Sequence, residues 1–153
     1  MLNTKVNIKR TESSDKDFTH LIHALDKELT KRYGKIQKTF NKHNYIEPNN
    51  AVIIATIYNK PIGCGCFKTY DKSSIEIKRM FVKQEYRGLG VSKLILNELE
   101  NWAKMLGFNR AILETGIKQP EAIGLYKNHG YLQIENYGQY KNVVTSVCFE
   151  KNF

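Results

Sequence analysis

The sequence has few of the residues that cross-link or break up a fold. Its 153 residues include three cysteines, three prolines and one tryptophan. An odd number of thiols and a start too polar for a secretion signal favour reduced cysteines in a cytoplasmic protein. Cys64 and Cys66 are separated by one residue, which is not the usual spacing of a metal or redox pair. We therefore expect no metal site.

Long apolar runs and blocks of like charge are also missing. No stretch approaches the ~20 apolar residues that a membrane-spanning helix needs, so we expect no membrane partner. The formal net charge is +9, but the lysines are scattered from Lys5 to Lys151. A basic surface attracts nucleic acid, acidic lipid or a phosphorylated cofactor, and charge alone does not choose among them. Because the aromatic residues lie mostly in apolar periodic runs, a nucleic-acid-binding module is the disfavoured alternative.

The remaining composition and patterning are typical of one folded domain. Hydrophobic residues make up 41% and charged residues 25%, and residues 1–153 contain no repeat or linker, so we predict a single domain. Apolar and alternating runs predict strands at residues 6–10, 51–58, 62–70, 75–82, 111–114, 131–134 and 143–150. Helical spacing predicts helices at 14–33, 91–106 and 120–129, with Ser14 and Asp17 as a variant capping box. The element order predicts an α+β domain with a mostly antiparallel sheet.

Residues 83–93, between a predicted buried strand and an amphipathic helix, carry the most informative pattern. Gly88 and Gly90 allow a sharp turn and a close approach of the backbone to a ligand. The unpaired N–H groups of the next helical turn form an anion site that suits a pyrophosphate, and Arg87 and Lys93 add charge. The segment matches neither the P-loop nor the glycine-rich dinucleotide pattern. A plain strand-to-helix turn is the alternative interpretation.

Two segments carry a resemblance to a known family. Arg-Gly-Leu-Gly-Val-Ser at residues 87–92 resembles the pattern Gln/Arg-x-x-Gly-x-Gly/Ala of the GNAT superfamily of N-acetyltransferases, with Ser92 at the last position. Residues 119–131 resemble the family's downstream pattern Asn-x-x-Ala-x-x-Leu-Tyr-x-x-x-Gly-Phe/Tyr, with Gln119 in place of asparagine. The resemblance covers residues 51–153 well and the first fifty only in outline. Motifs such as Leu-Glu-Thr-Gly at 113–116 resemble a bacterial subgroup without an assigned substrate.

The resemblance implies a fold and a cofactor. The expected fold is GNAT-like, with a mostly antiparallel, six- to seven-stranded mixed sheet flanked by about four helices. The expected acyl donor is acetyl-CoA, without a metal. The loop backbone would cradle the pyrophosphate of coenzyme A, and the strand before the loop would pair with the pantetheine arm. The residues implied in cofactor binding are Met80, Phe81, Val82, Arg87, Gly88, Leu89, Gly90, Val91, Ser92, Lys93 and Gln119.

Acyl transfer to an amine needs a base, because an alkylamine with a pKa near ~10 is protonated at neutral pH, and a proton donor for the leaving thiolate. The family resemblance implies Tyr126 as the acid, with a core tyrosine as the alternative. Glu76 is the candidate base, acting directly or through a water, and Glu114 is its rival. Alternation places Glu76 on the same face as Met80 and Val82 unless a bulge intervenes.

The remaining candidates have weaker support. A backbone N–H near Phe81 or Val82 is the expected oxyanion donor. His129 precedes a helix-ending glycine, so a capping or surface role is favoured over a base. Cys148 is not expected to act as a nucleophile, because the family transfers the acyl group directly. Five tyrosines are candidates for the acceptor pocket, since aromatic walls suit an ammonium group: Tyr33, Tyr45, Tyr86, Tyr137 and Tyr140.

The resemblance predicts the reaction better than it predicts the acceptor. A small-molecule primary amine is favoured. A protein lysine or N-terminus remains an alternative, as does a non-catalytic module that only binds acyl-CoA. Homodimers are common in the family, so the resemblance also implies a homodimer.

Overall fold

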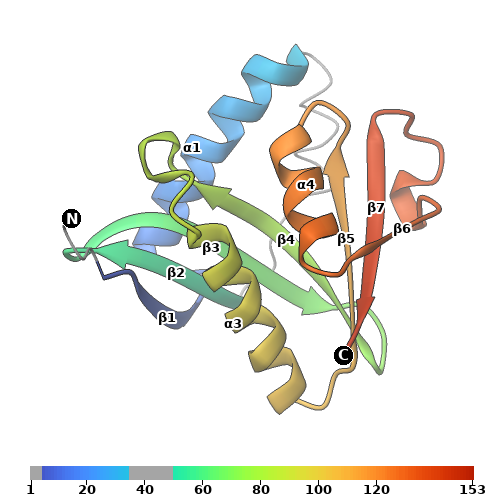
Figure 1. The fold of residues 1–153 in the computed structure, drawn as a ribbon, viewed down its shortest axis with the longest axis horizontal. Coiled ribbons are helices and arrows are strands. Elements are labelled where there is room, and N and C mark those ends of the chain that lie inside the picture. Colours follow the sequence, from blue (N-terminus) through green and yellow to red (C-terminus); the bar gives the residue numbers. More distant parts are fainter. Residues whose placement is uncertain (1–4, 35–49) are drawn as a thin grey trace.

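The computed structural model describes residues 5–34 and 50–153, which form one seven-stranded sheet with helices packed on it (Figure 1). The strand order is β1-β2-β3-β4-β5-β7-β6, and every neighbouring pair is antiparallel except β4–β5. The strands are β1 (Asn7–Glu12), β2 (Ala51–Ile57), β3 (Lys60–Thr69), β4 (Ser74–Val82), β5 (Arg110–Gly116), β6 (Leu132–Ile134) and β7 (Ser146–Asn152). The predicted α+β fold with a mostly antiparallel mixed sheet is confirmed.

Three α-helices lie in the described residues, where the family resemblance implied about four. They are α1 (Lys16–Tyr33), α3 (Val91–Met105) and α4 (Pro120–Asn128), with short 3-10 helices η2 (Gln84–Tyr86) and η3 (Gly138–Tyr140). None of the helices in the described part of the chain is long and apolar enough to cross a membrane.

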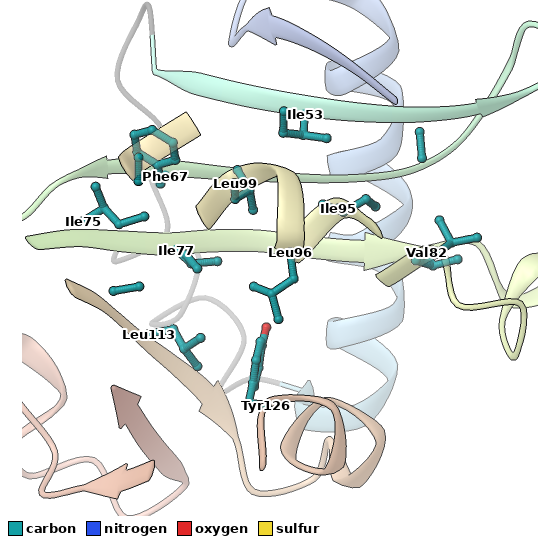
Figure 2. Packing of buried hydrophobic residues seen from close by; sticks show 14 of the residues in the cluster. Ile53, Phe67, Ile75, Ile77, Val82, Ile95, Leu96, Leu99, Leu113 and Tyr126 are labelled. Atoms are coloured by element: carbon teal, nitrogen blue, oxygen red, sulfur yellow. The ribbon is translucent and has the colours of Figure 1, made fainter. Parts of the chain in front are cut away.

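The helices α1 and α3 cover opposite faces of the sheet (Figure 1). The apolar stripe of α3 packs on one face, where Ile95 and Leu99 lie over Ile53 and Ile77 (Figure 2). The stripe of α1 packs on the other face, against a cluster that includes Cys64. The alternation of β2 supplies both cores, because successive side chains of a strand point to opposite faces.

The start of α1 differs from the predicted capping box. Asp15 is the N-cap, and its carboxylate accepts a hydrogen bond from the Asp17 N–H at 2.9 Å. The Ser14 hydroxyl instead donates to the Glu12 carboxylate at 2.9 Å. The capping role predicted for Ser14 is therefore wrong, because a carboxylate one residue later reaches the orphan N–H groups. The predicted end of the helix at Gly34 is confirmed, where φ is +60°.

A β-bulge in β4 decides which side chains face α1. Cys66 pairs with Lys78, but Cys64 pairs with Phe81, so β4 carries one extra residue at this point. Arg79 lies in the bulge with a φ of +60°, which is uncommon for a non-glycine residue. Ile77, Met80 and Val82 consequently share the α3 face.

The bulge corrects the predicted alternation. Phe81 packs in the cluster under α1, and Lys78 pairs with a residue of that same cluster, so Lys78 and Glu76, two residues before it, face α1. The expectation that Glu76 shares a face with Met80 and Val82 is wrong, since the extra residue inverts the parity between them.

The parallel pairing of β4 with β5 is short. It runs from the Ser74–Arg110 pair to the Ile77–Leu113 pair, and beyond it the two strands spread apart (Figure 1). We refer to these four residue pairs as the seam. The backbone edge of β4 after Ile77 therefore faces an opening rather than a neighbouring strand.

Candidate active site

A cavity of about 260 Å³ lies where β4 and β5 separate. Its walls come from α1, from β4 and the loop that follows it, from the start of α3, from the end of β5, from α4 and from η3. Seven of the predicted cofactor-binding residues border it: Met80, Phe81, Val82, Arg87, Gly88, Ser92 and Gln119. Tyr126, Glu76 and Glu114 border it as well, so the fold brings the donor segment and the proposed acid and bases to one place.

The loop before α3 has the geometry that its two glycines predict. Gly88 and Gly90 have φ values of +84° and +80°, a region that side chains disfavour. Gly90 is the N-cap of α3, and no side chain caps this end. A Cβ added to either glycine would meet no heavy atom within 4 Å, so the space beside this backbone is open. Because the first N–H groups of a helix have no intrahelical partner, the loop fits a phosphate group.

Four predicted cofactor residues of this loop lie around the helix start rather than on the cavity wall. Leu89 is exposed, and Val91 is buried in the core beneath α3. Gly90 and Lys93 lie with them in the loop and the first turn of α3. Their predicted contacts are with the phosphates, through backbone or charge, and stay a prediction.

Arg87 is engaged within the protein. Its Nε donates to the Val82 carbonyl at 2.8 Å, and its guanidinium pairs with the Glu28 carboxylate of α1 at 2.8 and 3.0 Å. The positive charge is therefore balanced by Glu28, and the side chain ties the loop to α1 and to β4.

Gln119 closes the turn from β5 to α4. Its Oε1 accepts a hydrogen bond from the Gly116 N–H at 3.1 Å. The position is tight, since a Cβ on Gly116 would clash with the Tyr33 hydroxyl. That hydroxyl accepts a hydrogen bond from the Lys118 N–H at 3.0 Å. Gln119 thus organises this wall of the cavity, and its predicted contact with the cofactor stays a prediction.

Tyr126 projects from α4, and its side chain is almost entirely buried. Its ring makes an edge contact with Tyr131, with centroids 5.7 Å apart, and a tilted contact with Phe149 at 6.0 Å. Figure 2 shows its hydroxyl pointing from α4 toward Leu96. Burial, reinforced by the charge of Glu114, raises the pKa of Tyr126. The phenol therefore keeps its proton at neutral pH.

Glu76 is buried and already occupied by several partners. The Tyr137 hydroxyl donates to its Oε2 at 2.6 Å. The ammonium groups of Lys68 and Lys78 lie 3.6 and 3.8 Å from its Oε1. Both oxygens of Glu76 are therefore engaged by groups of the protein itself.

Glu114 has the environment of a base. The Ser146 hydroxyl donates to its Oε2 at 2.5 Å. Burial raises the pKa of Glu114 to about 7, against the opposing effects of the Ser146 hydrogen bond and the charge of Lys78. A carboxyl with a pKa near 7 populates both protonation states at neutral pH, as a general base should.

Lys78 borders the cavity, and we assigned it no role from the sequence. Its side chain is 3% exposed and borders the cavity, and its Nζ donates to the Tyr140 hydroxyl at 3.3 Å. Burial lowers the pKa of Lys78, and the nearby Glu76 opposes this effect. The available signal was a lysine inside the apolar run 75–82, because lysine is rarely buried without a partner.

The five candidate tyrosines of the acceptor pocket divide into three groups. Tyr33 and Tyr140 border the cavity. Tyr137 reaches the site through Glu76, and Tyr86 lies in η2. Tyr45 lies outside the described residues.

Other reactive residues lie apart from the cavity. His129 is the C-cap of α4, with its Nε2 3.7 Å from Glu100, which agrees with the favoured capping role. All three cysteines are free and buried, and burial raises the pKa of Cys148 to about 11. Across residues 5–34 and 50–153, no three His, Cys, Asp or Glu side chains form a group that could hold a metal ion.

The sequence matches a family model and curated relatives. The model of the Acetyltransferase (GNAT) family matches residues 16–131. The "IAA acetyltransferase" of Azospirillum brasilense is 27% identical over 148 residues, which covers 95% of this chain and 97% of that protein. The "Probable N-acetyltransferase 14" of Xenopus tropicalis is 36% identical over 92 residues, which covers 58% of this chain. The match spans about half of that relative, 45% of its length.

Solved structures share the fold over nearly the whole chain. A Klebsiella pneumoniae protein, provisionally assigned as an acyl-CoA N-acyltransferase, has a TM-score of 0.81 at 26% identity and covers 98% of this chain and 99% of its own. The PaiA N-acetyltransferase of Thermoplasma acidophilum, solved with coenzyme A, has a TM-score of 0.76 at 16% identity and covers 97% and 99%. The chain therefore belongs to the GNAT family of acetyltransferases, and its fold is that of acetyl-CoA-dependent N-acetyltransferases.

Proposed function

We propose that this protein transfers an acetyl group from acetyl-CoA directly to the primary amine of a small molecule. The observation that carries the proposal is the cavity between the spread ends of β4 and β5, which opens beside the glycine-bearing start of α3. The coenzyme A in the related Thermoplasma acidophilum structure supports the same donor here.

The chain offers two kinds of contact to the donor. The loop backbone at Gly88 and Gly90 and the first turn of α3 suit the pyrophosphate, because they present N–H groups beside open space. The edge of β4 at Met80 to Val82, which does not pair with β5, suits the amide-containing pantetheine arm. Acetyl-CoA, when bound, supplies an activated thioester carbonyl.

The base is best assigned to Glu114. The amine must lose a proton before its nitrogen bonds to the thioester carbon, and Glu114 can take that proton directly or through a water. Its pKa of about 7 and its place on the cavity wall support this assignment over Glu76. Glu76 is instead the partner of Lys68, Lys78 and Tyr137.

Tyr126 completes the transfer. As the carbon–sulfur bond breaks, its buried phenol gives a proton to the sulfur leaving group. A backbone N–H near Phe81 or Val82 would hold the negative oxygen that forms at the carbonyl. The nitrogen loses a second proton as the amide forms, and this proton restores the Tyr126 phenol, while the proton taken by Glu114 passes to solvent.

A small acceptor is favoured over a protein side chain. The cavity volume of about 260 Å³ is shared between the thioester and the acceptor, and its far end holds the buried charges of Glu76 and Lys78. A protein lysine or N-terminus, or a module that binds acyl-CoA without turnover, are the alternative functions. A cytoplasmic location and a homodimer remain predictions, and light scattering would check the homodimer.

The first test is calorimetric titration with acetyl-CoA, followed by a thiol-release assay with an amine library. We expect saturable binding on the order of micromolar and release of coenzyme A that depends on an amine. Binding without release in any amine or peptide would support the non-catalytic alternative. Absence of binding at millimolar acetyl-CoA would refute the proposal.

A further inference from the structure

We propose that the acceptor is an α-amino acid, whose carboxylate binds at Lys78 and whose amine faces Glu114. This inference rests on the proposed function and deepens it by naming the substrate class. It is carried by the arrangement of charged groups around the cavity.

Most charged side chains that line the cavity form ion pairs of one basic and one acidic residue. The pairs join α1 to other parts of the wall: Arg79–Asp26 at 2.7 Å, Arg87–Glu28 at 2.8 Å and Arg32–Glu121 at 2.5 Å. Each pair is neutral as a unit. An acceptor gains little from them, since an ion pair that is already formed must be broken to bind a new charge.

Among the described residues, four further charged groups lie at or behind the far end of the cavity, where Glu76, Lys78 and Glu114 border it and Lys68 does not. Lys68 and Lys78 both lie within 4 Å of the same Glu76 oxygen, so two ammonium groups share one carboxylate. Glu114, the fourth group, is hydrogen-bonded to Ser146. With Glu114 ionised, the two ammonium groups and the two carboxylates carry no net charge together. Lys78 and Glu114 then present opposite charges at different places on the cavity wall.

A zwitterion fits this set better than a simple amine. A buried site resists any net change in charge, because an uncompensated ion loses its hydration. An ammonium group alone would add one positive charge beside Lys78. An α-amino acid adds none, and it places its carboxylate toward Lys78 and its amine toward Glu114. Lys78 and Glu114 border the same cavity, and each perturbs the ionisation of the other, so both can face one small ligand.

The helix η3 and the residue before it, Tyr137, position the charges that receive the ligand. The Tyr140 hydroxyl accepts a hydrogen bond from Lys78, and the Tyr137 hydroxyl donates to Glu76. The two rings pack edge to face with centroids 5.6 Å apart. Tyr137 and Tyr140 are therefore positioning residues, and the loop between β6 and β7 becomes a determinant of acceptor choice.

Matched acceptors test the inference. L-Amino acids, their α-carboxamides and the corresponding decarboxylated amines are compared at a fixed concentration of acetyl-CoA by thiol release. We expect a kcat/KM about 10- to 100-fold higher for the amino acid than for its carboxamide, as for loss of a hydrogen bond to a charged group. Lys78→Met should abolish this preference while acetyl-CoA binding by calorimetry is kept.

Lys68→Met is the matched control. It also removes an ammonium group from Glu76, but Lys68 is about one-third exposed and does not border the cavity. We expect it to keep the preference for the acid. Tyr140→Phe serves where Lys78→Met fails to fold, and it should raise KM for the amino acid without changing KM for the carboxamide.

The outcomes separate this inference from the proposed function. Equal or faster turnover of carboxamides or simple amines would overturn the inference and leave the acetyltransferase proposal intact. Binding of acetyl-CoA with no acetylation of any amino acid would do the same. Failure to bind acetyl-CoA would overturn both. An equal loss of preference in Lys68→Met and Lys78→Met would also overturn it, because the effect would then be general electrostatics.

Discussion

The two ends of the cavity are built in different ways. The donor end is a contiguous loop and helix start, whose chemistry comes from the backbone at Gly88 and Gly90. The acceptor end is assembled from side chains of β4, β5, β7 and η3, which are far apart in the sequence. A backbone site needs few particular side chains, whereas a side-chain site changes its ligand with each substitution. The donor end is thus suited to a constant cofactor and the acceptor end to a particular substrate.

The largest expected effect tests whether the acceptor end contains the base. Glu114→Gln should lower kcat by about 1,000-fold, because a general base contributes roughly 10²- to 10⁴-fold. In the unmodified protein kcat/KM should rise with pH up to about 7, since burial raises the pKa of Glu114 to about 7 and only the ionised form accepts a proton. The variant should lose this rise, which a pH–rate profile would measure.

Glu76→Gln is the matched control for that prediction. Because both oxygens of Glu76 are engaged by Tyr137, Lys68 and Lys78, its removal should alter acceptor KM and keep the rise in rate near pH 7. A flat profile in Glu76→Gln with an unchanged profile in Glu114→Gln would assign the base to Glu76 instead.

The second effect tests whether the donor end depends on backbone conformation. Gly90→Val should weaken acetyl-CoA binding by about 100-fold, because a β-branched residue disfavours a φ of +80° and its side chain would fill the space beside the loop. Calorimetry would measure the change. Gly124→Ala in α4 is the control and should bind normally, since Gly124 has no positive φ and a Cβ there meets no atom within 4 Å.

A third, smaller effect concerns the proton donor between the two ends. Tyr126→Phe should lower kcat by about 10-fold, because a thiolate leaves without full protonation and the phenol only assists. Acetyl-CoA binding should be retained, since the ring still packs on Tyr131 and Phe149. A change in the dissociation constant with an unchanged kcat would mean that Tyr126 only shapes the cavity.

The smallest expected effect tests whether Arg87 aids cofactor binding through its positive charge or by holding the loop to α1. Arg87→Ala should weaken acetyl-CoA binding by about threefold, as expected for a surface ion pair. Glu28→Gln frees the guanidinium and separates the two roles. It should weaken binding if Arg87 acts by holding the loop to α1, and tighten binding if Arg87 acts as a charge near phosphate. Calorimetry at two salt concentrations would measure both variants.

The same difference between the two ends explains what could be predicted from the sequence. Glycines, helix periodicity and the two family patterns are local, and they predicted the loop, α3, α4 and the mixed sheet. The pairing of Glu76 with Tyr137 and of Glu114 with Ser146 joins residues 61 and 32 positions apart, which no local pattern reveals. The sequence allowed for a bulge after Glu76 but could not place it at Arg79, because an extra residue in one strand is defined only by its partner strand.

Because the seam between β4 and β5 is short, ligand binding in the cavity should be measurable as a gain in thermal stability. Only four residue pairs join the two parts of the sheet there, and a ligand in the cavity touches both parts. Such a ligand binds the folded state alone, so at 100 times its dissociation constant it adds about 2.7 kcal/mol of stability. For a chain of 153 residues this corresponds to a rise in melting temperature of about 5–10 °C. Binding of a donor or an acceptor can thus be detected by thermal unfolding before any reaction product has been identified.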